Sequence, residues 1–254
     1  MIKSLLRYPK LIIPSQHIFL ISHMRANTTL LGHLLGSSDE ISGYYEMHTG
    51  YYSWKSLLKQ KIMFHSANSK EVPTKFYFDK ILHSEHYLNE TILNRENCSF
   101  IFMLRSPERT IKSICKLYRN LEPKHEFAQV EGATNYYTKR VSDIGNIICN
   151  IKDTNKITYI DAECLVNKTN ESLEFLTNRI GLKSKLKSEY KKFELTGKKN
   201  YGDSSSKIDI GHVSKSDNSY DDIELESDLI KDVEDIYVRV RDELIRKSQF
   251  SLII

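Results

Sequence analysis

The sequence predicts a single α/β domain in which a parallel sheet of four or five strands carries helices on both faces. Short apolar runs alternate with longer stretches of helical periodicity, and this alternation is typical of such a sheet. Residues 18–35 show it clearly, because a buried strand, a short polar turn and an apolar-periodic helix follow one another there. With 254 residues and 40% hydrophobic content, the chain can bury one large core.

The individual elements follow from the same periodicity. The expected strands are Ile18–Ser22, Lys75–Phe78, Ser99–Leu104 and Ile157–Asp161. The expected helices are Thr29–Leu35, His83–Arg95, Pro107–Tyr118, Thr134–Asn150, Glu171–Ile180 and Asp228–Arg246. Residues 201–220 are rich in Ser, Asp, Gly and Lys, and this composition predicts a long loop that is either mobile or ordered by a ligand.

Charge and cysteine content exclude several classes of protein. The 37 Lys and Arg residues against 33 Asp and Glu give a net charge of +4, too small a bias to indicate a nucleic-acid partner. The four cysteines lie far apart without CxxC spacing, which favours reduced structural thiols. No signal peptide or membrane-spanning stretch is evident, so we expect a cytoplasmic protein of open oligomeric state.

The turn at residues 25–30 reads Arg-Ala-Asn-Thr-Thr-Leu and opens the first helix. A helix start presents free backbone N–H groups and the positive end of the helix dipole, and an arginine and hydroxyls complete an anion site. The turn lacks the glycines and lysine of a Walker A loop, which argues against Walker-type ATP binding. Asn27 is expected to adopt the left-handed conformation that glycine usually supplies. An ordinary helix cap at Thr28 or Thr29 explains the turn equally well.

A second strand end carries similar chemistry. The strand Ser99–Leu104 is followed by Arg105, and Ser106-Pro107-Glu108 then combines a cap residue, a proline and an acid at a helix start. Ser113 lies about two turns along that helix, where its hydroxyl can approach the Arg105 guanidinium. An arginine with a hydroxyl is a good receptor for a dianionic phosphate. Together the two strand ends predict a site for a ligand with two phosphate groups.

These motifs, in this order, resemble those of the sulfotransferase family, which transfers sulfonate from 3′-phosphoadenosine 5′-phosphosulfate (PAPS) to an acceptor. The family's first loop, Arg/Lys-Ser-Gly-Ser/Thr-Thr-x-Leu, binds the 5′-phosphosulfate. Its second motif, Arg-x-Pro followed six residues later by Ser, binds the 3′-phosphate. Residues 202–208, 159–161 and 180–182 are similar to further family segments. The resemblance implies a three-layer, P-loop-like core in a single domain over residues 1–254.

The resemblance also assigns donor-binding residues. These are Arg25, Ala26, Asn27, Thr28, Thr29, Arg105, Ser113, Ser204, Ser205 and Lys207. Two positions depart from the family pattern, because Ala26 replaces a serine and Asn27 replaces a glycine. One hydroxyl is thereby lost, while the backbone N–H donors remain. No metal is required by this scheme.

Sulfonate transfer is an in-line displacement in which negative charge builds on the oxygen bridging to the leaving phosphate, so a nearby cation lowers the barrier. We assign that role to Arg25. The resemblance places Lys80 where many relatives carry an assisting lysine, with Lys75 as the alternative. The acceptor hydroxyl needs a base. Glu46, in a place comparable to the catalytic glutamate of tyrosylprotein and carbohydrate members, is the first choice, and His48 is the second.

Resemblance to bacterial and carbohydrate-type members predicts an acceptor hydroxyl on a glycan, glycolipid or polysaccharide precursor. A group of nearby aromatic residues either stacks on a sugar or belongs to the core. This group comprises Tyr44, Tyr45, Tyr51, Tyr52 and Trp54.

Two alternative functions stay open. A nucleotide or small-molecule kinase would need magnesium ligands and a phosphate-clamping lysine. A non-catalytic relative would keep the nucleotide site without activity.

Overall fold

The computed structural model describes residues 6, 9–68, 72–194, 196, 208–214, 220 and 222–254. A six-stranded parallel sheet forms its centre, in the order β2-β3-β1-β4-β5-β6. The strands are β1 (Gln16–Ile21), β2 (Ile41–Ser42), β3 (Phe76–Ile81), β4 (Cys98–Leu104), β5 (Ile157–Asp161) and β6 (Phe250–Leu252). The predicted fold class is therefore confirmed, with six strands instead of four or five.

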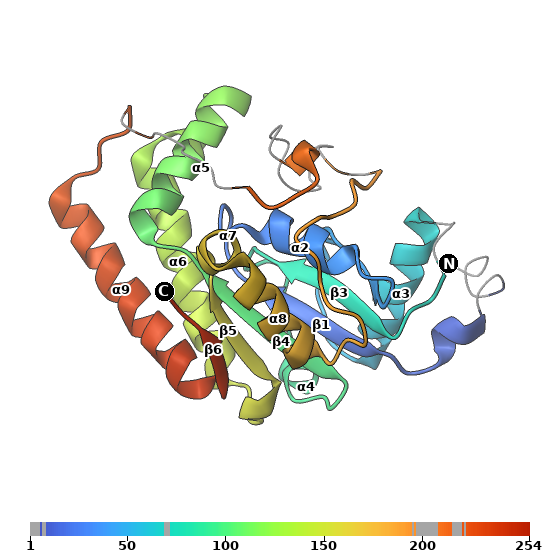
Figure 1. Ribbon diagram of the computed structural model, residues 1–254. Coiled ribbons are helices and arrows are strands. Elements are labelled where there is room, and N and C mark those ends of the chain that lie inside the picture. Colours follow the sequence, from blue (N-terminus) through green and yellow to red (C-terminus); the bar gives the residue numbers. More distant parts are fainter. Residues whose placement is uncertain are drawn as a thin grey trace.

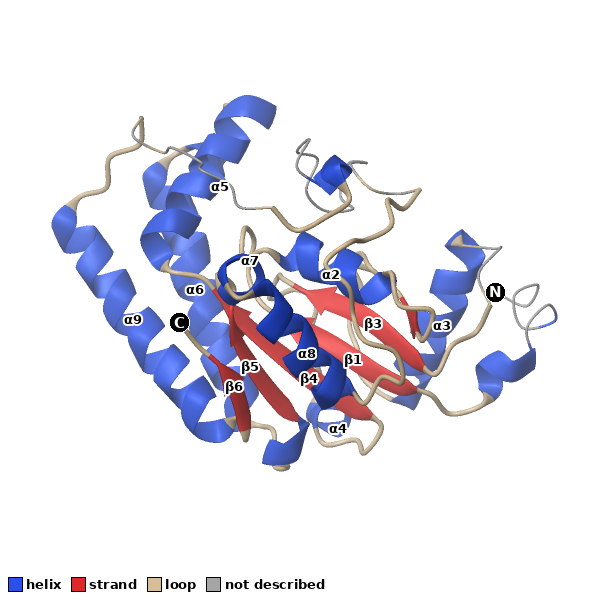
Figure 2. Ribbon diagram, in the orientation of Figure 1, coloured by secondary structure: helices blue, strands red, loops and turns tan. Residues whose placement is uncertain are grey.

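Helices cover both faces of the sheet (Figure 1; Figure 2). The α-helices are α2 (Thr28–Gly36), α3 (Trp54–Ala67), α4 (Glu90–Leu93), α5 (Pro107–Leu121), α6 (Val130–Cys149), α7 (Cys164–Asn167), α8 (Thr169–Ile180) and α9 (Ser227–Lys247). Short 3₁₀ helices are η1 (Pro9–Ile12), η2 (Glu126–Ala128), η3 (Thr154–Lys156) and η4 (Ile208–Ile210). None of the helices in the described ranges is long and apolar enough to cross a lipid bilayer.

Alternate side chains of β1 enter two different parts of the core. Phe19 and Ile21 pack among residues of α5, α6 and α9, whereas Ile18 and Leu20 pack among residues of α2, α7 and α8. Successive side chains of a strand point to opposite faces, and both faces of this sheet are covered. This explains why β1 reads as a continuous apolar run.

Several elements differ from the sequence-based predictions. The expected helix over residues 83–95 is wrong, because only Glu90–Leu93 is helical and Asn89 caps it by accepting a hydrogen bond from Thr91 N. The strands β2 and β6, of two and three residues, are too short to show periodicity. Helix α3 was missed because its buried face includes Gln60, Lys61 and His65, which obscure the apolar stripe.

The order of the strands places three connections at one edge of the sheet. β1 lies between β3 and β4, so the segments that follow these strands meet at their carboxyl ends. These segments are residues 22–27, 82–88 and 105–106. In open α/β sheets, ligands bind at such a point.

Candidate active site

The turn between β1 and α2 adopts an unusual backbone conformation. Arg25 and Asn27 have positive φ angles of 63° and 56°. Asn27 thus takes the left-handed conformation that the sequence predicted in place of glycine, and its Nδ2 donates to Ala162 O at 2.9 Å. It also stands at the N-cap of α2 without a side-chain cap hydrogen bond, and Thr28 is the first helical residue. The interpretation of Thr28 or Thr29 as the cap is therefore wrong.

The side chain of Ala26 faces the core. It is fully buried and belongs to the apolar cluster that includes Leu31 and Met103. A serine there would place its hydroxyl in apolar surroundings, which is costly without a partner. Only the backbone groups of Ala26 are therefore left to contact a ligand.

The two predicted anion-binding motifs meet in the structure. Arg25 Nε donates to Ser113 Oγ at 3.0 Å, and Arg105 Nη1 donates to the carbonyl oxygen of Arg25 at 2.9 Å. Ser113 lies in α5 and is buried. Two guanidinium groups and one hydroxyl therefore gather at the carboxyl ends of β1 and β4.

Arg105 retains an unused donor. Its Nε is buried and has no hydrogen-bond partner among the described residues, and the nearest carboxylate oxygen, Glu163 Oε1, is 3.8 Å away. Burial lowers the pKa of Arg105, while Tyr220 and Glu163 act in the opposite direction. A guanidinium stays protonated in proteins, so this buried cation suits an anionic ligand.

A buried histidine fixes the end of β1 against the end of β4. His23 Nε2 accepts from the backbone N–H of Arg105 at 3.1 Å, so its Nδ1 carries the proton and donates to Met24 O at 2.9 Å. Burial lowers the pKa of His23 to about 3, with smaller effects of Arg140 and Arg105 in the same direction. The ring is therefore neutral and serves as a structural bridge.

Three side chains of α6, Tyr136, Tyr137 and Arg140, hold the strand ends from one face. The accepting carbonyl groups belong to Leu82, Arg105, Ser22 and Ile81, at 2.5–3.1 Å. These residues did not appear among the sequence predictions, although Tyr136 and Arg140 are four positions apart in a helical pattern and thus share a face. They make the carboxyl edge rigid.

Glu46 lies in the loop after β2, and its side chain is buried. Its Oε1 accepts from Leu82 N at 3.4 Å, just beyond the end of β3, and lies 4.0 Å from His86 Nε2. Gly32 permits the loop to approach α2, because a Cβ at this position would clash with the carbonyl oxygen of Tyr44. Glu46 is thus brought to the same sheet edge as the arginines.

Asp79 fixes the loop that carries Glu46. Its Oδ1 accepts from Met47 N at 2.9 Å and from Lys80 N at 2.7 Å, and its Oδ2 accepts from Tyr51 Oη at 2.5 Å. Burial raises the pKa of Asp79 to about 7, against the opposing effect of these hydrogen bonds. Sequence reasoning gave Asp79 no role, and its position directly before Lys80 was the available signal.

The two candidate lysines lie at opposite ends of β3. Lys80 is buried near the carboxyl end, and its side chain runs beside α2, with Cδ 3.7 Å from the position of a Cβ on Gly32. Lys75 precedes the strand, is exposed, and places its ammonium 4.6 Å from the centre of the Phe76 ring. Lys75 therefore lies at the end of β3 opposite the carboxyl edge, and the assignment of Lys80 stays a prediction.

His48 lies close to the same loop. Its backbone has a φ of 49°, and its Nδ1 is 3.3 Å from Nε2 of His86, which also neighbours Glu46. Its side chain is exposed. The structure thus gathers both candidate bases and one histidine that the sequence did not single out.

No protein-family model matches this sequence, and no curated protein matches it. Among solved structures it is similar to the "Sulfotransferase Domain from the Curacin Biosynthetic Pathway", with 17% sequence identity and a TM-score of 0.61. The alignment covers 90% of this chain and 98% of that chain. This chain has the fold of a sulfotransferase domain.

Ser204, Ser205 and Lys207 lie outside the described residues. The following element, η4, lies above α2 in Figure 1, and its Ile208 packs in the cluster on the α2 face. Tyr220, further along the same segment, is buried and hydrogen-bonds to Arg105. The C-terminal segment therefore reaches the second anion-binding motif.

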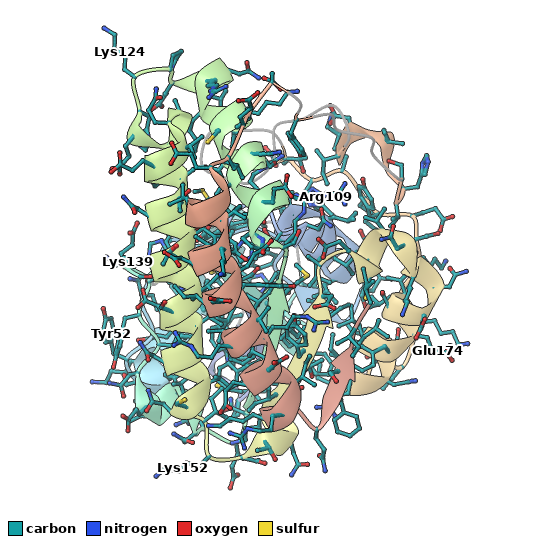
Figure 3. The ribbon with its side chains drawn as sticks, turned by 90° about the vertical axis from the view of Figure 1, so that its left-hand side faces the viewer. Tyr52, Arg109, Lys124, Lys139, Lys152 and Glu174 are labelled. Atoms are coloured by element: carbon teal, nitrogen blue, oxygen red, sulfur yellow. The ribbon has the colours of Figure 1, made fainter. Side chains whose placement is uncertain are left out.

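One further cation stands beside this motif. Arg109 lies in the first turn of α5, where Figure 3 labels it, and its side chain is exposed. Its charge contributes to the lowered pKa of Arg105. The sequence signal for Arg109 was its position four residues after Arg105, one turn along the helix.

The aromatic group divides into two. Tyr44, Tyr45 and Tyr51 are buried and belong to the core, which is one of the two interpretations of this group. Tyr52 and Trp54 are 58% and 55% exposed. Of these five residues, Tyr52 and Trp54 therefore remain available for stacking.

Proposed function

We propose that this protein is a sulfotransferase that moves a sulfonate group from PAPS to an acceptor hydroxyl. The observation that carries the proposal is the meeting of Arg25, Arg105 and Ser113 at adjacent strand ends of a sulfotransferase fold. An arginine at each of the two strand ends suits a ligand that carries more than one anionic group. A donor with phosphate groups at both ends supplies such anions.

The residues present suit this donor. Arg105 has a buried, unused Nε, and with Ser113 it would hold the 3′-phosphate. Arg25 and the backbone start of α2, with Thr28 and Thr29, would hold the 5′-phosphosulfate. In this proposal Ser204, Ser205 and Lys207 also bind the donor.

The donor supplies an activated sulfonate, and the chain supplies charge and proton transfer around it. Arg25 and Lys80 stabilise the negative charge that develops on the leaving phosphate. Glu46 accepts the proton of the acceptor hydroxyl as its oxygen bonds to sulfur. The backbone N–H of Leu82 and the anchored Met47 hold Glu46 in place. His48 is the second candidate for the base.

A groove beside Glu46 supports a glycan as acceptor. It has a volume of about 360 Å³ and lies between residues 84–93 and α6. Its lining includes Arg140 and also His86, whose Nε2 is 4.0 Å from Glu46 Oε1. Its other lining residues are Ser84, Tyr87, Leu88, Glu90, Leu93, Asp143, Asn146, Ile147 and Asn150. Carboxylates and amides bind sugar hydroxyls, and an aromatic ring stacks on a sugar face.

An exposed aromatic pair lies beside this groove. The ring of Tyr87, which lines the groove, is 5.9 Å from that of Tyr52, and both residues are at least half exposed. Figure 3 labels Tyr52 on the side of the molecule where α6 lies. The groove therefore combines an apolar platform with hydroxyl-binding groups, as a sugar requires.

Thermal unfolding with adenosine 3′,5′-bisphosphate, the reaction product, tests the proposal. A hundredfold excess of ligand over its Kd adds about 2.7 kcal/mol to the free energy of unfolding, which raises the Tm by several degrees. We expect this shift in the presence of a chelator and a smaller one with ATP. Stabilisation by ATP only with magnesium would indicate a kinase instead. Bisphosphate binding without sulfonate transfer to any member of a glycan panel would indicate a non-catalytic relative.

A further inference from the structure

We propose that Glu46, His48 and His86 form a binding site for a divalent transition metal of the zinc class, and that metal bound there inhibits the enzyme. One ligand atom from each of these three residues lies within 4.8 Å of the other two. Two imidazoles and a carboxylate are the donors that Zn²⁺ and its neighbours prefer, whereas Mg²⁺ and Ca²⁺ prefer oxygen ligands. Sequence reasoning singled out Glu46 and His48 as candidate bases but predicted no metal site.

The separation of the imidazoles fits a shared metal. His48 Nδ1 and His86 Nε2 are 3.3 Å apart. Two nitrogens bound to tetrahedral zinc at about 2.0–2.1 Å lie about 3.3 Å from each other. Glu46 Oε1 is 4.0 Å from His86 Nε2. The carboxylate must therefore approach by about 0.7 Å to reach a tetrahedral position.

The backbone around the three residues is already fixed. Glu46 and His48 flank Met47, whose N–H donates to the buried Asp79. The loop that carries His86 is joined to the same segment, because Tyr51 N donates to Tyr87 O at 2.8 Å and Asn89 N donates to Tyr51 O at 2.9 Å. A site whose ligands are held before binding loses less entropy on binding.

The exposure of the three residues suits a reversible site. Glu46 is buried, His86 is partly buried and His48 is exposed, so a cation reaches the site from solvent. Three protein ligands leave the fourth position of a tetrahedral ion open to water or to an acceptor group.

A bound metal would block the proposed reaction directly. A carboxylate that coordinates a cation is no longer available to take a proton, and the same applies to His48. The inhibition rests on the proposed function, whereas binding of the metal does not. Zinc should therefore suppress transfer without weakening donor binding at Arg105 and Ser113.

Cobalt(II) titration of the full chain, after treatment with a chelator, tests the site without any donor or acceptor. We expect one Co²⁺ per chain, visible absorption bands of low-coordinate cobalt, and displacement by Zn²⁺. His86→Ala and His48→Asn should each weaken Co²⁺ binding at least tenfold. Asparagine tolerates the positive φ of His48 and so preserves the loop. The control His212→Ala removes an exposed histidine elsewhere and should bind Co²⁺ as the unaltered chain does.

Two results would overturn the metal site. One is the absence of saturable Co²⁺ binding, and the other is unchanged binding in both folded variants, checked by circular dichroism. Sulfonate transfer without Co²⁺ binding would contradict the metal site alone. Co²⁺ binding without transfer to any acceptor would contradict the proposed function and leave the site in place. If both activities are present, Zn²⁺ should inhibit transfer with a midpoint near its Kd, and chelator should restore it.

Discussion

Arg25 Nε donates a hydrogen bond to Ser113 Oγ at 3.0 Å, although 88 positions separate the two residues. This contact joins the start of α2 to α5. Because the carbonyl oxygen of Arg25 also accepts from Arg105 Nη1, each motif supports the other. Ligand binding at one motif should therefore depend on the other.

Replacement of Ser113 tests this dependence. Ser113→Ala removes a hydroxyl that contacts a guanidinium, and hydrogen bonds to charged groups contribute about 1.5–3 kcal/mol. We expect the Kd for adenosine 3′,5′-bisphosphate, measured by titration calorimetry, to rise at least tenfold.

Lys112→Ala is the matched control for Ser113→Ala. Lys112 lies next to Ser113 in α5, but its ammonium pairs with Glu108 at 2.7 Å. This variant should change bisphosphate affinity by less than threefold. Equal losses in the two variants would show that a general change in α5 or in charge, and not the Arg25–Ser113 contact, determines binding.

Replacement of Glu46 separates chemistry from binding. General base catalysis contributes about 10²–10⁴ in rate, so Glu46→Gln should lower kcat for sulfonate transfer by that range while the bisphosphate Kd stays the same. The exposed Glu85, in the turn after β3, provides the control Glu85→Gln, which should retain activity. Full activity in Glu46→Gln together with loss in His48→Asn would assign the base to His48.

The fold was predictable where the local sequence pattern agrees with the burial of the element in the folded protein. β1, β4 and β5 lie in a sheet covered on both faces, so their sequences are mostly apolar and were recognised. Ser106 and Pro107 marked the start of α5 correctly. Helix α3 was hidden because buried polar residues such as Gln60 find specific partners, in this case His17 Nδ1 at 2.6 Å. No periodicity reveals such pairs.

The site was predictable only in part, because its parts come from distant segments. Resemblance to family motifs singled out Arg25, Arg105 and Ser113, and the structure supplies the contacts between them. His86 approaches His48 because the segments around Tyr51 and Leu88 pair, which nothing in the local sequence indicates. The anchoring role of Asp79 likewise depends on a loop that begins after β2.

The raised pKa of Asp79, about 7, predicts a specific pH dependence of stability. An unfolded aspartate has a pKa of about 3.9, so between about pH 4 and pH 7 the folded state holds a proton that the unfolded state releases. The contribution of Asp79 to stability is therefore full below about pH 4 and is lost as the pH rises to about 7.

Asp79→Asn removes this titration while an amide oxygen still accepts from Met47 N and Lys80 N. Urea unfolding should show the unaltered chain losing stability relative to Asp79→Asn as the pH rises from about 4 to about 7. His17 and His23, whose pKa values burial lowers, titrate in both proteins and cancel in the difference. A difference that does not vary with pH would contradict the raised pKa.

Asn27 provides a test of the turn that binds the donor. Asn27→Gly keeps the left-handed conformation but loses the hydrogen bond to Ala162 O, at a cost of about 0.5–1.5 kcal/mol. Asn27→Ala loses the same bond and adds about 1–2 kcal/mol of backbone strain. Urea unfolding should rank the stabilities as asparagine, then glycine, then alanine. An alanine variant more stable than the glycine variant would contradict the conformational argument.

The ion pair between Arg241 and Asp161 should stabilise the far side of the sheet. Arg241 Nε and Nη2 donate to the two oxygens of Asp161 at 2.9 and 2.6 Å, joining α9 to the end of β5. Burial alone would raise the pKa of Asp161, but hydrogen bonds from Arg241, Tyr159 and the Ile254 backbone lower it overall. Removal of Arg241 leaves a carboxylate that is only 5% exposed without its cation.

Arg241→Ala should therefore lower the free energy of unfolding by about 2–4 kcal/mol, near the range for loss of one partner of a buried pair. For a chain of this size, this corresponds to a fall in Tm of about 4–8 °C by differential scanning calorimetry. Arg246→Ala is the matched control, because Arg246 also makes a two-pronged pair on α9, with Glu243, but at the surface. Exposed pairs contribute about 0–1 kcal/mol. Equal shifts in Tm for the two variants would show that helix α9 itself, and not its link to β5, determines the loss of stability.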